Sequence, residues 1–335
     1  MTNITILSWN IDGLGYLRTV RAQREPKRRT INDELRICLI EKYQPDFILL
    51  QEVVKYENDG RETEEIVDMA EIGKSYHYHS SMVIDTEKNN HPGKWGPIKE
   101  KGGWGNNTYL AQGSAILWKR DIQHCSIWEH DRENLSMNKY LKQEEVRLDN
   151  GLYTGDRDSE PRTATVSRFL VHKRDLLLVN LHLTTLKGER EGLPERDEAG
   201  SKLRLWQLDL ILNGIVSRYN FWRQNHEELQ KQPKPFWFLA GDFNGTEVSP
   251  EIQKLKRMRF QDVSPIKGAD GRGSGTKRSK GEKKASITLD YIFAGIEYSA
   301  FDPHKMRERT EQLPPVYEVQ TSDHFPVVAR FSLED

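Results

Sequence analysis

The sequence predicts one α/β domain built from two packed sheets with flanking helices, and three observations support this. Apolar runs with the character of β-strands recur along the whole chain. Amphipathic segments of helical period follow the first run and precede a later run at 236–240. The 335 residues contain no internal repeat and no linker between separate cores. We therefore expect a single domain over residues 1–335, with surface loop insertions at 85–109 and 264–286.

The N-terminal part begins with a strand and a helix. Residues 4–10 have a β-branched bias and run into a loop, which predicts a strand that ends at Asn10. Residues 30–43 carry their apolar side chains on one face, which indicates a helix. Thr30 and Asp33 have the spacing of a capping box at its start.

A glutamate follows the second predicted strand directly. Residues 47–50 form a continuous apolar run of the buried type, and we expect this strand to end at Gln51 and Glu52. A glutamate at the end of a buried strand is expected to aim its carboxylate at a site. The alternative is an ordinary loop glutamate. Residues 112–118 predict a further strand.

Two consecutive strands are predicted in the middle of the chain. Residues 163–171 and 176–183 are apolar and β-branched, and the polar residues 172–175 between them suit a hairpin turn. His182 alternates with leucines, so its side chain is expected on the opposite face from theirs. A single histidine in a strand is often only a hydrogen-bonded polar residue without a catalytic role. A role for His182 therefore depends on the other candidate site residues.

A second helix and another buried strand follow. Residues 201–219 have the helical period, with Ser201 in the N-cap position. The run 236–240 opens into Gly241, where we expect the backbone to approach a ligand closely. Asp242 and Asn244 are two residues apart, so an extended backbone would point both side chains the same way.

The last two predicted strands bring an aspartate and a histidine. Asp290 stands in the middle of the apolar run 287–294, and burying an aspartate is costly unless it is paired. Asp323 and His324 directly precede the final strand at 327–331. We expect Asp290 to pair with the imidazole of His324 and to orient it.

The sequence also predicts the cellular location of the protein. The first strand begins almost at the initiator methionine, so we expect no signal or transit peptide. No apolar stretch reaches the roughly 20 residues that span a bilayer, and the two cysteines are expected to be reduced thiols. These features predict a cytoplasmic protein, or a nuclear one in a eukaryote, with no membrane association.

Charge is distributed unevenly although the net charge is −1. Residues 252–286 contain eleven Lys and Arg against three acids, a local charge of +8, and residues 18–36 contain seven against three, a local charge of +4. Such asymmetry creates the basic surface that a polyanionic partner requires. The alternative is a pair of solvated charged loops.

Six short motifs in order resemble those of the endonuclease/exonuclease/phosphatase superfamily, the metal-dependent phosphoesterases related to deoxyribonuclease I. The opening motif, residues 9–14, is similar to that of the branch of tyrosyl-DNA phosphodiesterase of the second type. The resemblance covers nearly the whole chain and implies a four-layered αββα sandwich. The motifs are Trp9-Asn10, Leu50-Gln51-Glu52, Asn180-Leu181-His182, Gly241-Asp242-Phe243-Asn244, Leu289-Asp290-Tyr291-Ile292 and Ser322-Asp323-His324.

The resemblance implies a metal and a water at the site. Glu52 corresponds to the main metal-binding carboxylate, and Asn10 and Asp323 help to place the metal or its waters. Asp242 corresponds to the residue that orients or deprotonates the attacking water. Asn244 corresponds to one that positions the water or contacts phosphate. The expected metal is Mg²⁺, which needs only one or two carboxylates, with Mn²⁺ as a substitute.

The resemblance also implies groups that bind the phosphate. His182 and His324 correspond to the pair that stabilises the pentacovalent phosphate, and Asp290 to the residue that orients His324. Arg162, just before a strand, corresponds to a phosphate-contacting arginine. No covalent intermediate is implied, since water is the nucleophile.

These features predict a magnesium-dependent nuclease or DNA-end-processing phosphodiesterase that acts on DNA or RNA. Segments 18–36 and 264–286 are expected to hold the backbone of the substrate, with Lys277 and Arg278 among the contacts. One alternative is a phosphatase of a small phosphorylated metabolite or lipid headgroup, although Tyr291 stands where the inositol-polyphosphate phosphatases carry arginine. The other is a catalytically inactive nucleic-acid-binding protein. Nothing in the sequence indicates an obligate protein partner.

Overall fold

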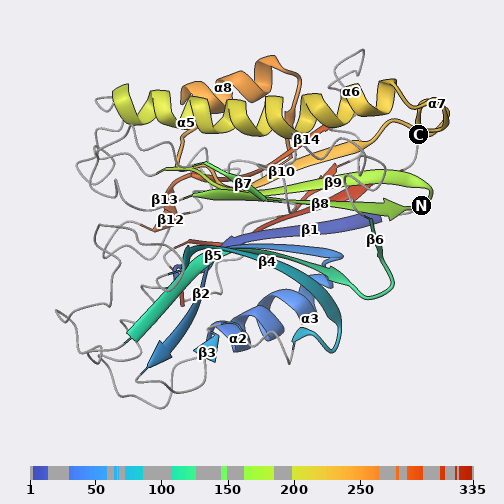
Figure 1. Cartoon of the computed structure of the whole chain (residues 1–335). Coiled ribbons are helices and arrows are strands. Elements are labelled where there is room, and N and C mark those ends of the chain that lie inside the picture. The colour runs from blue at the N-terminus through green and yellow to red at the C-terminus, as the bar shows by residue number, and fades with distance from the viewer. Residues whose placement is uncertain are drawn as a thin grey trace.

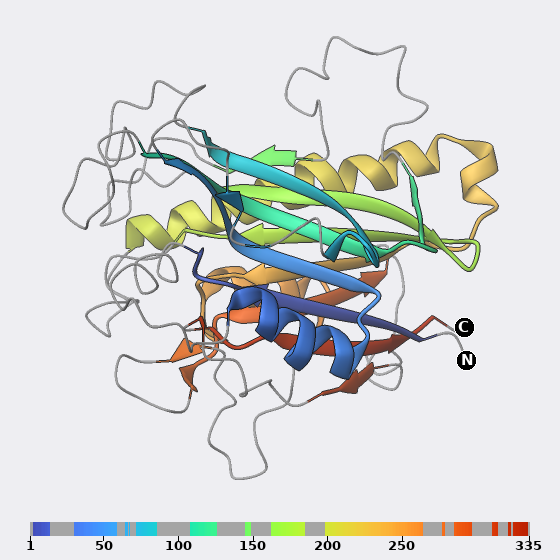
Figure 2. The same ribbon diagram turned by 90° about the horizontal axis from the view of Figure 1, so that it is seen from below.

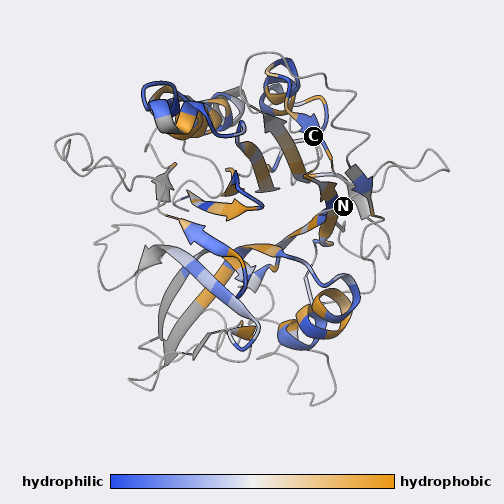
Figure 3. Ribbon diagram, turned by 90° about the vertical axis from the view of Figure 1, so that its right-hand side faces the viewer, coloured by the Kyte–Doolittle hydropathy of each residue, from blue (hydrophilic) through white to orange (hydrophobic). Residues whose placement is uncertain are grey.

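Two β-sheets stacked face to face form the middle of the molecule, and helices cover both outer faces (Figure 1). Figure 3 shows the same layers from the side, with the sheets between the helices. The order helix, sheet, sheet, helix confirms the predicted αββα sandwich. The computed structural model describes residues 3–13, 30–58, 64–65, 67, 72–85, 108–125, 145–148, 162–184, 198–263, 277–278, 285–296, 310–313, 321–322 and 324–333.

The first sheet is mixed, because β1 and β2 run parallel while its other pairs run antiparallel. β1 lies in its centre and begins at Asn3, opposite Ser332. The strand order is β15 (Thr310–Gln312), β16 (Val327–Ser332), β1 (Asn3–Asn10), β2 (Phe47–Asn58), β5 (Thr108–Lys119) and β4 (Tyr76–Asp85), with β3 (Glu64–Glu65) paired to β2.

The second sheet is built in the same way, with one parallel pair, β9 and β10, among antiparallel neighbours. A separate small sheet pairs β12 (Lys277–Arg278) with β13 (Ala285–Ile287). The order of the large sheet is β11 (Gln261–Asp262), β14 (Asp290–Ile296), β10 (Phe236–Asp242), β9 (Arg174–His182), β8 (Thr163–Val171) and β6 (Gln123–Cys125), with β7 (Glu145–Arg147) paired to β8.

One continuous helix covers the first sheet, as the view from below shows (Figure 2). It consists of α2 (Ile31–Asp33), the π-helical turns of η1 (Glu34–Ile40) and α3 (Glu41–Tyr43). Thr30 caps it, and the reciprocal hydrogen bonds between Thr30 and Asp33 form the predicted capping box. The helix ends at Gln44, which adopts a left-handed conformation.

The other outer layer lies on the second sheet. Its helices are α5 (Glu198–Ile211), η5 (Leu212–Ser217), α6 (Arg218–Gln224), α7 (Glu227–Gln230) and α8 (Pro250–Arg257). The prediction that Ser201 caps a helix over 201–219 was wrong, because the helix begins at Glu198 and continues to Gln224. In the described part of the chain, no helix combines the length and apolar character needed to cross a membrane.

Three apolar layers hold the four structural layers together. One packs the helix 31–43 on the first sheet, one packs the sheets on each other, and one packs the second sheet on α5, η5, α6 and α8. Aromatic rings contact one another in the middle layer, where the ring centroids of Phe47 and Phe169 are 4.9 Å apart and those of Phe236 and Phe331 are 5.2 Å apart. This burial fixes which ends of the strands meet at the edge of the sandwich.

Three further differences from the predicted boundaries concern β2, the turn between β8 and β9, and Asp290. β2 does not end at Glu52 but continues to Asn58, because Glu52 is the extra residue of a β-bulge between Gln51 and Val53. The hairpin turn between β8 and β9 contains only His172 and Lys173. Both have positive φ, 49° and 64°, as a two-residue turn with the right twist requires.

The third difference concerns Asp290, which opens β14 instead of standing in the middle of a strand. β13 ends at Ile287, and the carbonyl of Leu289 accepts a hydrogen bond from the Phe243 amide between the two strands. Of the expected loop insertions, residues 86–107, 264–276 and 279–284 lie outside the described residues. The single domain over 1–335 stays a prediction.

Candidate active site

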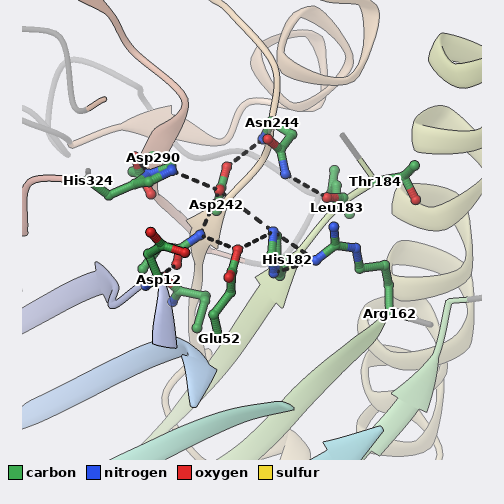
Figure 4. Close-up of polar contacts among 12 residues, drawn as sticks. Asp12, Glu52, Arg162, His182, Leu183, Thr184, Asp242, Asn244, Asp290 and His324 are labelled. Carbon is green, nitrogen blue, oxygen red and sulfur yellow. Dashed lines mark hydrogen bonds and ion pairs between the residues drawn. The ribbon is translucent and has the colours of Figure 1, made fainter. Parts of the chain in front are cut away.

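Three polar side chains lie next to one another where the second sheet ends (Figure 4). His182 is the last residue of β9, Asp242 is the last of β10, and Asp290 is the first of β14. The strand register pairs Asp242 with both of the others, and all three are buried. Since paired residues on neighbouring strands share a face, their side chains converge on one point between the sheets.

The first sheet contributes two further side chains to the same point. Asn10 ends β1, and Glu52 occupies the bulge of β2 with φ of 56°. A non-glycine residue in this conformation costs about 1–3 kcal/mol, and here it directs the carboxylate inward. The Asn10 amide Nδ2 donates to Glu52 Oε1 at 3.2 Å and to Asp242 Oδ2 at 3.0 Å. Asn10 therefore joins the carboxylates of the two sheets.

His324 enters from the turn before β16. Its Nδ1 lies 2.8 Å from Asp290 Oδ2, and its Nε2 lies 3.7 Å from Asp242 Oδ2. Its backbone is held as well, because its carbonyl accepts from Trp9 Nε1 at 3.1 Å. The structure thus brings His324 and Asp290 together as a hydrogen-bonded pair, with the other ring nitrogen turned to the centre.

His182 faces the same carboxylates from the other side. Its Nε2 lies 3.7 Å from Asp242 Oδ2 and 3.8 Å from Glu52 Oε1. Arg162, which is buried just before β8, places Nη1 at 2.7 Å from Nδ1 and 2.9 Å from Nε2 of this ring. A guanidinium cation therefore lies directly against the imidazole at the edge of the site.

Asn244 lies beside Asp242 for a reason other than the expected one. Its φ is 48°, so the backbone is not extended there. Instead the Asn244 amide N–H donates to Asp242 Oδ1 at 2.8 Å, and its side-chain Nδ2 donates to the carbonyl of Leu183 at 2.8 Å. At Gly241 a Cβ would meet the backbone of Leu181 in β9, and the expected close approach to a ligand stays a prediction.

Three of the predicted site residues are not placed. Asp323 lies outside the described residues, although Ser322 and His324 on either side of it are described. For Lys277 and Arg278 the structure describes the backbone, in β12, and not the side chains. Their contacts with a substrate therefore stay predictions.

The order of these motifs along the chain agrees with one known family. The model of the endonuclease/exonuclease/phosphatase family matches residues 7–324. The chain belongs to the endonuclease/exonuclease/phosphatase family. It is accordingly a hydrolase of phosphoester bonds, and the resemblance inferred from the six motifs is confirmed. No curated protein matches the sequence.

Several solved structures share the fold. An endonuclease/exonuclease/phosphatase family protein from Bacteroides thetaiotaomicron is 16% identical, with a TM-score of 0.54 over 99% of each chain. D. rerio TDP2, solved with a single-strand DNA product, is 15% identical with a TM-score of 0.51 over 99% of this chain and 100% of its own. The human Nocturnin catalytic domain, solved with a bound sulfate anion, is 16% identical with a TM-score of 0.50 over 98% of this chain and 94% of its own.

The donor set of the site suits a divalent cation. Three buried carboxylates, those of Glu52, Asp242 and Asp290, converge there, and such a charge density requires compensation. Ligand atoms of Asp242, Asp290 and His324 all lie within 4.8 Å of one another. Carboxylate oxygens are the ligands that hard divalent cations prefer. Asn10 turns its NH₂ group to the carboxylates, while its Oδ1 accepts from the Asp12 amide at 3.0 Å.

Tyr291 does not share the site, although it follows Asp290. It lies on the opposite face of β14, in the apolar layer beneath the helices. Burial, reinforced by the negative charges of Asp262, Glu247 and Asp290, raises the pKa of its hydroxyl above the ordinary value. The hydroxyl therefore keeps its proton and donates to the carbonyl of Thr288 at 3.2 Å.

Asn180 and Gln51, for which the sequence predicted no role, support the site from below. Asn180 Nδ2 donates to the carbonyls of Leu50 and Ala115, both at 2.9 Å, and its Oδ1 accepts from Gln51 Nε2 at 2.7 Å. These bonds join the two sheets directly beneath Glu52. The available signal was the position of Asn180, a polar residue within the apolar run of β9.

Proposed function

We propose that the protein is a magnesium-dependent phosphodiesterase that hydrolyses phosphodiester bonds of nucleic acids by attack of water. The observation that carries this proposal is the position of Asp242. Its Oδ2 lies 3.7 Å from Nε2 of both His182 and His324, so a carboxylate stands between two imidazoles. A base for water beside two donors for a phosphoryl group is what this reaction requires.

Asp242 is the proposed base. Its Oδ1 is occupied by the Asn244 amide, and its Oδ2 accepts from Asn10 Nδ2. These bonds fix the carboxylate beside the imidazoles of His182 and His324, where the attacking water would bind. Because the group is 1% exposed, a water bound there would be oriented by protein groups instead of bulk solvent.

The two histidines are the proposed donors to the phosphoryl oxygens. In its doubly protonated form, His324 donates from Nδ1 to Asp290 and from Nε2 to the centre. His182 stands on the other side with the Arg162 cation against its ring, so positive charge collects where the phosphate would bind. Mg²⁺, held by Glu52 with Asp323 and with Mn²⁺ as a substitute, would polarise the phosphoryl oxygen when bound.

A nucleic acid is the substrate class that charge favours. The basic stretches 18–36 and 252–286 carry local charges of +4 and +8 on a chain of net charge −1. The single-strand DNA product bound by D. rerio TDP2, a protein of the same fold, supports the same class. Lys277 and Arg278 are the proposed contacts to the backbone of the substrate.

The test is cleavage of end-labelled single- and double-stranded DNA and RNA, with magnesium or with EDTA. We expect magnesium-dependent products that are lost in His324→Ala by at least about 10²-fold. His77→Ala is the matched control. His77 is exposed on β4, and it pairs with Trp118 at the end of β5 that lies away from Glu52. Product lengths will separate internal from terminal cutting.

Two outcomes would contradict the proposal. Hydrolysis of a small phosphomonoester, with no polymer cut, would identify a phosphatase of a small metabolite or lipid headgroup. Binding of nucleic acid with no hydrolysis in any metal would identify an inactive binding protein, which has no need for the buried carboxylates.

A further inference from the structure

A buried glutamate in the outer helix is hydrogen-bonded to the turn that carries His324. Glu34, in η1, has no exposed surface. Its Oε2 accepts from the Thr321 amide at 2.9 Å and from Thr321 Oγ1 at 2.5 Å, across 287 residues of sequence. Burying a carboxylate is costly unless donors satisfy it, so this contact has a specific structural use.

Hydrogen bonds in the first turn of the helix hold the backbone of Glu34 in place. The capping box of Thr30 and Asp33 fixes the turn before it, and the Glu34 amide donates to the Thr30 carbonyl at 3.1 Å. Ile31 and Leu35 lie in the same apolar cluster as Phe325, the residue after His324. The helix therefore holds the turn on both sides of the histidine, by hydrogen bonds at Thr321 and by packing at Phe325.

Ser322 links the contact between Glu34 and Thr321 to His324. Ser322 Oγ donates to the Asn10 carbonyl at 2.7 Å and accepts from the His324 amide at 3.0 Å. Ser322 is bonded covalently to Thr321, so moving Thr321 moves the group that fixes both Asn10 and His324. The ring of His324 must at the same time keep its 2.8 Å bond to Asp290.

We infer that Glu34 is a positioning residue for phosphoester hydrolysis, which acts by holding Thr321 and thereby the imidazole of His324. This inference rests on the proposed role of His324. Glu34 touches no reacting atom. Its loss should therefore lower kcat through misplacement of the imidazole and leave substrate binding nearly unchanged.

The test compares Glu34→Ala, which removes the acceptor, with Glu34→Gln, which keeps a carbonyl acceptor of the same length. Glu41→Ala is the control, because Glu41 is exposed on the same helix. With the labelled nucleic acid, or bis(4-nitrophenyl) phosphate, we expect Glu34→Ala to lower kcat about tenfold or more with KM within about twofold. Glu34→Gln should restore most of kcat, and the control should match the wild type.

A second measurement does not depend on turnover. Hydrogen exchange of the peptide 321–326 should become faster in Glu34→Ala than in Glu34→Gln or Glu41→Ala. The effects of Glu34→Ala and Thr321→Val on kcat should be less than additive, since Thr321→Val removes one of the two hydrogen bonds that Glu34→Ala removes. Unchanged exchange, full additivity, a change confined to KM or a Gln variant as impaired as the Ala variant would each overturn the inference.

The two proposals fail in distinguishable ways. If the wild type hydrolyses a phosphoester and His324→Ala abolishes it while Glu34→Ala changes nothing, only the role of Glu34 is wrong. If no phosphoester is hydrolysed, the proposed function is wrong, and hydrogen exchange alone decides whether Glu34 holds the turn.

Discussion

At the scale of single residues, the site depends on backbone conformations that side chains do not favour. Glu52 and Asn244 have φ of 56° and 48°, and Gly241 has φ of 141°. Glu52 lies in the bulge of β2, Gly241 precedes Asp242 in β10, and Asn244 follows the end of β10. Such conformations persist only where the surrounding structure determines them, and they concentrate at functional sites.

Gly241 offers the sharpest test of this requirement. A Cβ at this position would collide with the carbonyl oxygen of Leu181, and its φ is strained for any other residue. We expect Gly241→Ala to lower the free energy of unfolding by about 2–4 kcal/mol, measured by urea denaturation.

Gly214→Ala is the control, because that helical glycine has nothing within 4 Å of a new Cβ. Gly214→Ala should be neutral or stabilising by up to about 1 kcal/mol. Equal effects at both positions would contradict this explanation.

The sequence indicated the chemistry of these residues better than their conformations. The carboxylate of Glu52 after an apolar run predicted a site, but the bulge that aims it arises from pairing with β5, more than fifty residues later. The pairing of Asp290 with His324 could be predicted, because a buried aspartate needs a partner. The left-handed turn at Asn244 could not, since it depends on the carbonyl of Leu183, which lies just after β9 and far away in the sequence.

At the scale of elements, a buried ion pair supports the loop after β10. Arg204 in α5 and Glu251 in α8 approach to 2.9 Å, and both are at most 2% exposed. Glu251 also packs against Gly245, the residue after Asn244. The two helices therefore hold the loop that carries Asn244 close to the site.

This ion pair should make stability depend on pH. Burial raises the pKa of Glu251 above its usual 4.5, more than Arg204 lowers it. The folded state then holds the proton more tightly than the unfolded state, so the contribution of Glu251 is fully present below pH 4.5 and is lost as pH rises through the raised pKa. Relative to Glu251→Gln, the wild type should lose unfolding free energy over that range, measured by urea denaturation from acid to neutral pH. If the wild type instead gained unfolding free energy relative to Glu251→Gln as the pH rises, attraction to Arg204 would outweigh burial. Glu247→Gln, in the exposed pair with Lys256, is the control.

Element types were more predictable than element ends. Apolar runs identified eight strands of the two large sheets, and periodicity identified the two long helices, because these patterns reflect which face is buried. They did not indicate β4, which lies at the edge of the first sheet. The helix around Ser201 begins earlier, and the hairpin turn is shorter, than the residue types suggest. Those limits are set by pairing and packing with distant segments, which local sequence does not contain.

At the scale of the whole molecule, the site exists only when the two sheets are stacked. Asn10 and Glu52 come from one sheet, His182 and Asp242 from the other, and Asn10 Nδ2 bridges them. The order of the motifs predicted the family and hence the sandwich. The buried link from Asn180 to Leu50 and Ala115, which fixes the sheets beneath the site, appears only in three dimensions.

The proposed role of Glu52 in metal binding is tested most directly by the response of Glu52→Gln to magnesium. Gln keeps the size of Glu52 and removes the charge proposed to hold the metal, so the fold should persist while turnover of labelled nucleic acid falls by about 10²-fold or more. Half-maximal activity should also need more magnesium. Unchanged turnover in Glu52→Gln, or wild-type cleavage that persists in EDTA, would contradict a metal-dependent phosphodiesterase centred on these residues.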